Sequence, residues 1–507
     1  MALNPVERRL VELCHHWEAF RQDPSKRLLI WQVPDNAVRM LQCFFEAQKH
    51  ETEYSAGGLF IVFDTPFENS IQYSRELKTT LAGRYDASRE LLSRQGVAPS
   101  WQYDPLETQD SAVGVLQSFC SFADTHQKDI GHLVAVLMPS RMGHLDGFIG
   151  WVQRIVSLNI PEHLRFVLID SVDHPRFTAL TAARHASVSV ETLHLDALTV
   201  AQETFAQEGA VGPAAVFRNY LMGMVTLIEK GSADQVKAKA QDALAFAKKE
   251  QWADQEVAVT MLLAGAFLKE KRVEEAVREY RSARNAALKT VEAHHPAGKT
   301  LVMQTWFGEA GVHLAAGELQ AATDCYDQAA TVARDVPNLI LAIEAYRMGI
   351  FCLGRAGQRA PALERADALV KLADQLEPDK RTMTTLPFAG MDILRALDPD
   401  RAKQVEDVKH RMDARQKQVL SNTEQQVSRL NDRAEAQQFH AVERSLEQGV
   451  REAEGIARQE LNAIVANSSE PFRQYLADMQ RLLGPEWPLT GTVAITPLLE
   501  PEGAAVS

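Results

Sequence analysis

Long hydrophobic runs are missing from this 507-residue sequence, although 46% of its residues are hydrophobic. A helix that crosses a membrane needs about 20 consecutive apolar residues, and no stretch approaches that length. The first residues, MALNPVERRLVELCHHWEAF, space their apolar side chains as a helix does and interrupt them with charges, unlike a secretion signal. We therefore expect no membrane insertion and a cytoplasmic location.

Cysteine is scarce, and no two cysteines have the C-x-x-C spacing of a metal site. The five cysteines are Cys14, Cys43, Cys120, Cys325 and Cys352. Their odd number and apolar neighbours favour reduced thiols that pack as small apolar side chains. In CHHWE, residues 14–18, the adjacent histidines point about 100° apart on a helix, which favours a surface helix over a metal site. We expect neither a metal site nor a cofactor.

Positive charge is in deficit. The chain has 54 Lys and Arg against 67 Asp and Glu, a net charge of -13 and a pI of about 5.7. Binding to nucleic acid needs a basic face that neutralises phosphates. We therefore expect no nucleic-acid partner.

Phosphate-binding loops are missing as well. KRLLIWQVPDNAVRMLQCFFEAQKH, residues 26–50, has the strand–turn–helix order in which such loops occur. The turn instead holds Pro34, which has no N–H to donate, and Asp35, whose carboxylate would repel a phosphate. AGKT at 297–300 follows no strand, and the motifs G-x-G-x-x-G and G-x-S-x-G are absent. We expect Asp35 or Asn36 simply to cap the following helix.

Strand and helix alternate over residues 1–205. Continuous apolar runs, typical of strands buried on both faces, occur at 27–33, 58–64, 132–139 and 164–170, with a weaker run at 187–195. Helical stretches lie near 35–50, 69–95, 109–127, 144–157 and 175–186. This alternation predicts an α/β domain with a mostly parallel, doubly wound sheet.

Five polar residues near the predicted strand ends are candidates for a residual pocket: Asp64, Ser140, Arg141, His144 and Asp170. Asp64 and Asp170 each close an apolar run, like the magnesium-holding aspartate of ATPases, although aspartate is also common in turns. The other three follow the third strand, at the sheet edge where α/β proteins bind ligands.

The character of the sequence changes at about residue 212, where strand patterns stop and alanine becomes frequent. Residues 263–283 and 309–329 align at an offset of 322 − 276 = 46. The aligned pairs are Ala264 and Ala310, Phe267 and His313, Ala276 and Ala322, Tyr280 and Tyr326, and Ala283 and Ala329. A third copy at an offset of 362 − 322 = 40 keeps Tyr346, Gly357 and Ala362 but departs at Ala366 and Leu369. The sequence predicts paired helices over 212–395.

This pattern resembles the tetratricopeptide repeat, although both offsets exceed its usual period of about 34 residues. The α/β domain followed by such repeats resembles a signal-transduction NTPase, here degenerate because its phosphate loop is missing. The repeat resemblance implies a partner-binding face on the first helix of each pair. Its residues would be Met261, Leu268, Lys269, Gln304, Phe307, Leu314, Glu344, Arg347, Phe351 and Arg355. An alternative is that the aromatic and leucine side chains among them only pack against a neighbouring helix.

Charged residues dominate from 400 to 485, with a sparse apolar stripe that includes Val405, Val408 and Met412. This favours long helices that pack on the repeats without a continuous coiled coil, and the alternative is an oligomer that forms through these helices. Residues 486–507 are expected to form an extended or disordered tail.

The leading hypothesis is a non-catalytic scaffold, adaptor or chaperone that holds a protein or peptide partner on its repeats. One alternative is a nucleotide-dependent signalling switch with an unorthodox site that uses Asp64 or Asp170. Another is a cytoplasmic chaperone or adaptor for a secreted bacterial effector.

Overall fold

The computed structural model describes residues 3–50, 54–94, 96, 99–183, 185–195, 199–200, 203–204, 212–336, 338–430 and 434–489. The chain divides into two compact units. The first unit comprises Met1–Ala210 and Ala414–Ala453, and the second comprises Val211–Asp413 and Glu454–Ser507. Among the described helices, none combines the length and the apolar character needed to cross a membrane.

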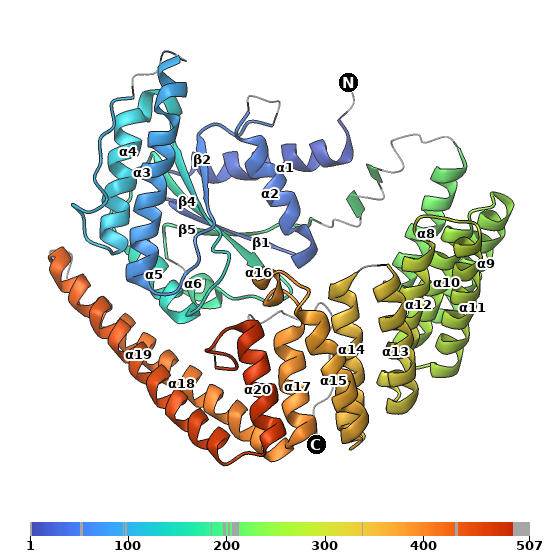
Figure 1. Cartoon of the computed structure of the whole chain (residues 1–507). Coiled ribbons are helices and arrows are strands. Elements are labelled where there is room, and N and C mark those ends of the chain that lie inside the picture. The colour runs from blue at the N-terminus through green and yellow to red at the C-terminus, as the bar shows by residue number, and fades with distance from the viewer. Residues whose placement is uncertain are drawn as a thin grey trace. The chain divides into compact units, whose positions relative to one another are not determined.

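A parallel sheet is at the centre of the first unit (Figure 1). Its strands are β1 (Leu28–Val33), β2 (Leu59–Phe63), β3 (Leu133–Leu137), β4 (Leu164–Ser171) and β5 (Val188–Thr192), in the order β2-β3-β4-β1-β5. Every strand pair is parallel, and in register Ile30 lies opposite Leu168. The chain leaves β1 towards β2 and leaves β4 towards β5, in opposite directions along the sheet. The carboxyl ends of β1 and β4 therefore flank the switch point at which open α/β sheets bind ligands.

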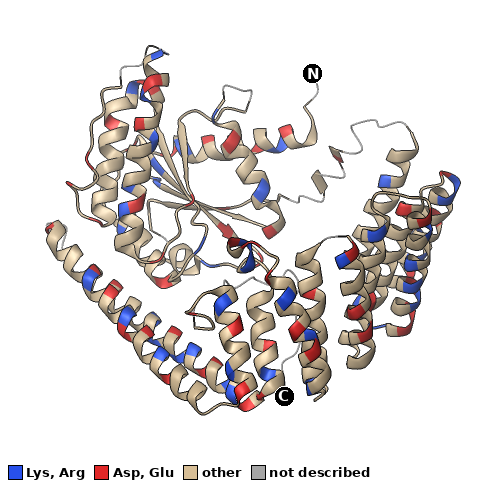
Figure 2. Cartoon of the chain, viewed as in Figure 1, with Lys and Arg blue, Asp and Glu red and all other residues tan. Residues whose placement is uncertain are grey.

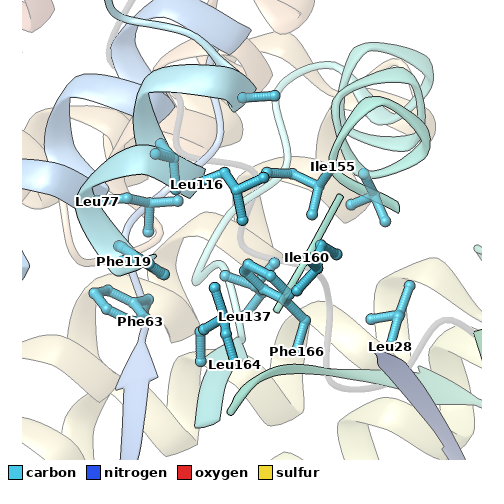
Figure 3. Close-up of a cluster of buried hydrophobic side chains, with 14 of the residues drawn as sticks. Leu28, Phe63, Leu77, Leu116, Phe119, Leu137, Ile155, Ile160, Leu164 and Phe166 are labelled. Carbon is cyan, nitrogen blue, oxygen red and sulfur yellow. The ribbon is translucent and has the colours of Figure 1, made fainter. Parts of the chain in front are cut away.

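Helices cover both faces of this sheet because successive strand residues point to opposite sides. On one face α3 (Ser70–Arg94), α4 (Ala112–Ile130) and α5 (Leu145–Ser157) enclose a buried cluster that includes Phe63, Phe119 and Phe166 (Figure 3). On the other face α1 (Pro5–Gln22) and α2 (Val38–Ala47) pack against alternate strand residues such as Trp31 and Val167. The predicted doubly wound α/β fold is confirmed.

The turn after β1 differs from the prediction that Asp35 or Asn36 caps the next helix. Residues Asp35–Ala37 form one 3-10 turn, and the N-cap of α2 is Ala37, without a side-chain cap bond. Asp35 instead accepts a hydrogen bond of 2.5 Å from the Ser171 hydroxyl at the end of β4. The capping prediction is wrong because the Asp35 carboxylate bonds to a residue of a neighbouring strand. The local sequence does not show that this strand is nearby.

Antiparallel helix pairs build the second unit, as the repeats predicted. They are α8 (Pro213–Lys230) with α9 (Ala233–Lys249), α10 (Ala253–Lys269) with α11 (Val273–Glu292), α12 (Gly298–Ala315) with α13 (Leu319–Asp335), and α14 (Leu339–Arg355) with α15 (Arg359–Ala373). The short α16 (Pro378–Arg381) and then α17 (Leu386–Leu397) follow, and α17 packs on α14. The helical-repeat fold class is confirmed.

The turns between paired helices support the sequence alignment of the repeats. Gly317 and Gly357, which follow α12 and α14, have φ angles of 76° and 70°. Lys271 holds the equivalent position after α10 and adopts the same left-handed backbone, with φ of 60°. A non-glycine residue is strained there by roughly 1 kcal/mol. The turn is therefore the same in three pairs, although only two of them carry the expected glycine.

The C-terminal helices are α18 (Pro399–Arg429), α19 (Ala436–Ala466) and α20 (Glu470–Leu483). Their stripe packs as predicted in the second unit, where Val405 and Met412 share a core with Leu461 and Phe472. Basic and acidic side chains are interspersed with uncharged residues along α18 and α19 (Figure 2).

The boundaries proposed for the C-terminal part differ from those observed. Residues 400–485 do not form a unit of their own, since Ala414–Ala453 belongs to the first unit. Of the predicted tail, Trp487 and Leu489 are buried in the core of the second unit. Residues 490–507 lie outside the described residues.

Candidate functional site

The first-helix face is the set of ten residues that the repeat resemblance selected. They are Met261, Leu268 and Lys269 on α10, Gln304, Phe307 and Leu314 on α12, and Glu344, Arg347, Phe351 and Arg355 on α14. Spacings of three, four and seven residues place the members of each group on one side of their helix, except for Lys269, which follows Leu268 directly and points about 100° away from it. The structure thus arranges these residues as one surface strip per helix pair.

The apolar members of this face are half-buried. The Phe307 ring meets the Tyr326 ring edge-on, with centroids 6.0 Å apart, and Leu314 and Phe351 pack against the same cluster as Tyr326. Met261 and Leu268 pack against the core formed by α8, α9, α10 and α11. Each side chain therefore serves the fold on one side and keeps part of its apolar surface open on the other.

Two of the cationic members are engaged within the chain. The Arg347 Nε donates to Glu344 over 2.9 Å, and its Nη1 lies 3.5 Å from an Asp392 oxygen. The Lys269 ammonium donates to the Ile228 and Glu229 carbonyls at the end of α8. The Arg347 guanidinium is thus held by carboxylates of α14 and α17 in the same chain, and its role in binding a partner stays a prediction.

Arg355 is the cation that remains open. Its guanidinium lies 5.7 Å from the Phe351 ring centroid, and within the described residues it has no ion-pair partner. Gln304 on the neighbouring first helix is also exposed. The face thus presents an aromatic ring under a free guanidinium, a combination suited to a partner with apolar and acidic groups.

Glycines inside the first helices have two different environments. A Cβ added at Gly308 would lie 2.1 Å from the Tyr280 ring, so packing requires glycine there. A Cβ at Gly265 or Gly311 would meet nothing within 4 Å, although each glycine costs a helix about 1 kcal/mol relative to alanine. These two glycines are 311 − 265 = 46 residues apart, the repeat offset, and they leave matching strips of bare backbone on α10 and α12.

A buried carboxyl lies beside the charged end of this face. Asp392 on α17 is 5% exposed and contacts Arg347 and also Arg395, whose Nη1 donates over 2.6 Å. Burial raises the pKa of Asp392 to about 6, and the two guanidinium groups only partly oppose that rise.

This shift predicts a pH dependence of stability. The pKa of Asp392 in the folded chain is above its ordinary value of 3.8, so its contribution to the free energy of unfolding is full below about pH 4 and is lost as the pH rises through about 6. At about 1.36 kcal/mol per pKa unit, the rise of the pKa from 3.8 to about 6 corresponds to a loss of roughly 3 kcal/mol. Urea unfolding of the wild type and Asp392→Asn between pH 4 and 7.5 measures it.

The wild type should lose more stability over that range than Asp392→Asn, while Asp335→Asn, at an exposed helix end, should follow the wild type. Parallel pH profiles for the wild type and Asp392→Asn would contradict the expectation.

The five residues considered for a residual pocket do not meet in one place. Asp64 and Ser140 line a cavity of about 1140 Å³ between α2, β2 and α3. His144 lines another cavity, of about 730 Å³, and its Nδ1 accepts the Gly147 N–H at the start of α5 over 2.8 Å. Arg141 pairs with Glu68.

Asp170 lies at the switch point and is 1% exposed. Its Oδ1 accepts the backbone N–H groups of Ser171 and Arg176, and its Oδ2 accepts that of Phe177. Both carboxylate oxygens therefore hold the loop after β4. Asp64 differs, because its side chain is 80% exposed and lies 4.0 Å from Arg84.

The cavity beside His144 includes a contact that sequence reasoning missed. Glu424 of α18 accepts hydrogen bonds from the Ser70 N–H, over 2.8 Å, and from the Ser70 hydroxyl at the start of α3. Nearby, Arg75 joins Asp110 to Glu443 of α19. No local pattern could reveal these pairs, since Ser70 and Glu424 are 354 residues apart in the sequence.

No protein-family model matches this chain, and no curated protein matches it. Among solved structures, the chain is similar to one described as the crystal structure of Rap protein complexed with competence and sporulation factor. The TM-score is 0.29 at 12% sequence identity, over 82% of this chain and 99% of that one.

Proposed function

We propose that this protein is a non-enzymatic scaffold that binds a peptide segment of a protein partner on the first-helix face. The observation that carries the proposal is the pair of interior glycines, Gly265 and Gly311, which occur at one repeat offset and at which an added Cβ would meet no described residue within 4 Å. Glycine in a helix permits close approach by another backbone. A peptide that runs across α10 and α12 is the ligand that such bare strips suit.

The open side chains indicate the chemistry of that peptide. The part-exposed Phe307, Leu314 and Phe351 favour apolar anchor residues. The Arg355 guanidinium, next to Phe351, favours a carboxylate close to one anchor. We therefore expect an acidic peptide with two or more apolar side chains.

Two features of the first unit support a non-enzymatic role. Pro34 and Asp35 occupy the turn in which a phosphate loop would present backbone N–H groups. At the same switch point Asp170 directs both oxygens to its own loop. A nucleotide-dependent switch would have to open these contacts first.

The test is selection of peptides from a random library on the full chain, followed by fluorescence anisotropy with the selected sequences. Phe351→Ala and Arg355→Glu should each weaken binding at least tenfold, because they remove the anchor surface and reverse the free charge. Lys371→Glu, the same charge change at an exposed site on α15, is the matched control and should change affinity less than twofold.

Equal losses in Arg355→Glu and Lys371→Glu would contradict docking on the first-helix face. Selected peptides without acidic residues would contradict the role of Arg355. Magnesium-dependent ATP turnover by the purified chain, abolished in Asp64→Ala or Asp170→Ala, would contradict the non-enzymatic part of the proposal.

A further inference from the structure

A histidine, a cysteine and a glutamate meet beneath the surface of the second unit. Glu309 and His313 are four residues apart on α12 and so share one side of that helix, and Cys325 comes from α13. One ligand atom from each residue lies within 4.8 Å of the other two, and all three residues are buried. The His313 Nε2 is 3.6 Å from the Glu309 Oε1.

The neighbouring repeats show how unusual this set is. At the offset of 46, the first copy has Leu263, Phe267 and Glu279, and at the offset of 40 the third copy has Gly349, Leu353 and Arg365. Leu263, Phe267 and Leu353 are buried apolar core residues. The middle copy therefore replaces core side chains by a carboxylate and an imidazole, a change that costs stability unless those groups are bound.

We propose that Glu309, His313 and Cys325 form a Zn²⁺ site that joins α12 to α13. Zn²⁺ takes oxygen, nitrogen and sulfur ligands in a tetrahedron with bonds of about 2.0–2.3 Å, so its ligand atoms lie roughly 3.3–3.7 Å apart. The three atoms need to approach by no more than about 1 Å to reach that geometry. A water completes the four ligands.

The surrounding hydrogen bonds already orient two of the three ligands. The His313 Nδ1 lies 2.6 Å from a Glu318 oxygen, which directs Nε2 towards the proposed ion. Arg284 donates to the Glu309 Oε2, which leaves Oε1 for the metal. Carboxylates behind ligating histidines and hydrogen bonds to ligating carboxylates are the usual support of zinc sites.

One contact opposes the ion. The Arg281 Nε donates to the Glu309 Oε1 over 2.8 Å. The Arg281 side chain is 61% exposed, so it can move into water at little cost. Arg284 cannot leave as easily, because its side chain is 11% exposed and its guanidinium stacks 3.4 Å from the Trp306 ring centroid.

The charges balance when Arg281 withdraws. Binding breaks the S–H bond of Cys325, releases its proton to water and forms a zinc–sulfur bond. Zn²⁺ and Arg284 then supply three positive charges, and the thiolate, Glu309 and Glu318 supply three negative charges. The sequence analysis predicted no metal site because no two cysteines have C-x-x-C spacing. Such local motifs do not show that Cys325 lies next to residues of the preceding helix.

The experiment uses the full chain, stripped with a chelator, and titrates it with Zn²⁺ by calorimetry and with Co²⁺ by absorption. We expect one equivalent of Zn²⁺ and a thiolate-to-cobalt charge-transfer band. Cys325→Ser should abolish the band and weaken Zn²⁺ binding at least tenfold. Cys352→Ser, which removes another buried thiol in the same unit, is the matched control and should keep both.

Arg281→Ala separates a metal site from a purely structural cluster, because it removes the competing donor from an exposed position. We expect Zn²⁺ affinity to rise at least threefold, and an equal or lower affinity would contradict the assignment. If Cys325→Ser fails to fold, His313→Gln serves as the second variant, and we expect it to lose the charge-transfer band. Absence of a charge-transfer band in the wild type, or its survival in Cys325→Ser, would overturn the proposal.

Discussion

Replacement of Lys78 by methionine is expected to destabilise the first unit by about 3–5 kcal/mol. The Lys78 side chain is fully buried, and its ammonium lies 3.0 Å from an Asp110 oxygen. It also donates to the Pro105, Thr108 and Gln109 carbonyls, over 2.7–3.1 Å. Methionine fills the space but leaves these acceptors buried without a donor, and each such loss costs roughly 1–3 kcal/mol.

Urea unfolding measures the loss, and hydrogen–deuterium exchange locates it. Faster exchange should appear in residues 105–111 and in α3, because Lys78 ties that segment to the helix. Lys128→Met, an exposed lysine in the last turn of α4, is the matched control and should change stability by less than about 0.5 kcal/mol. A loss below about 1 kcal/mol in Lys78→Met would show that water replaces the ammonium.

Two glycine substitutions three residues apart on α12 are expected to have opposite effects. In Gly308→Ala the new Cβ lies 2.1 Å from Cε1 and 2.5 Å from Cζ of Tyr280, a 9% exposed ring that has little room to move. Such overpacking costs about 1–3 kcal/mol. In Gly311→Ala the Cβ meets nothing, and the helix gains up to about 1 kcal/mol.

Thermal and urea unfolding of the two variants should therefore place them about 2–4 kcal/mol apart, with the wild type between them. The pair is its own control, since both changes add one methyl group to the same helix. Equal stabilities would mean that Tyr280 does not pack on α12 as described. If Gly311→Ala is more stable but binds the selected peptides less well, the bare backbone strip serves the partner and not the fold.

Much of the fold could be predicted because its determinants are local. Continuous apolar runs such as those around Ile30 and Val167 gave the buried strands, and the matched Tyr280 and Tyr326 gave the paired helices. Strand order could not be predicted, because it depends on which crossover packs where. The same limit explains the wrong cap at Asp35, whose partner Ser171 is 136 residues away.

The candidate sites divide in the same way. The first-helix face could be listed from repeat offsets, but offsets do not show that Arg347 is held by Asp392 while Arg355 stays open. The contact of Cys325 with Glu309 could not be predicted, since a turn and parts of two helices separate these residues in the sequence. Sites whose residues come from different helices are therefore hard to predict from a single sequence.

The discontinuity of the first unit has a consequence for synthesis on the ribosome. Ala414–Ala453, which provides Glu424 to α3 and Glu443 to Arg75, is translated after the whole helical-repeat segment. At typical elongation rates the 453 − 210 = 243 residues after the α/β segment take roughly 10–50 s to emerge. During that interval the start of α3 and the Arg75 guanidinium are without these carboxylates. The first unit therefore stays incomplete during synthesis until residues Ala414–Ala453 have emerged.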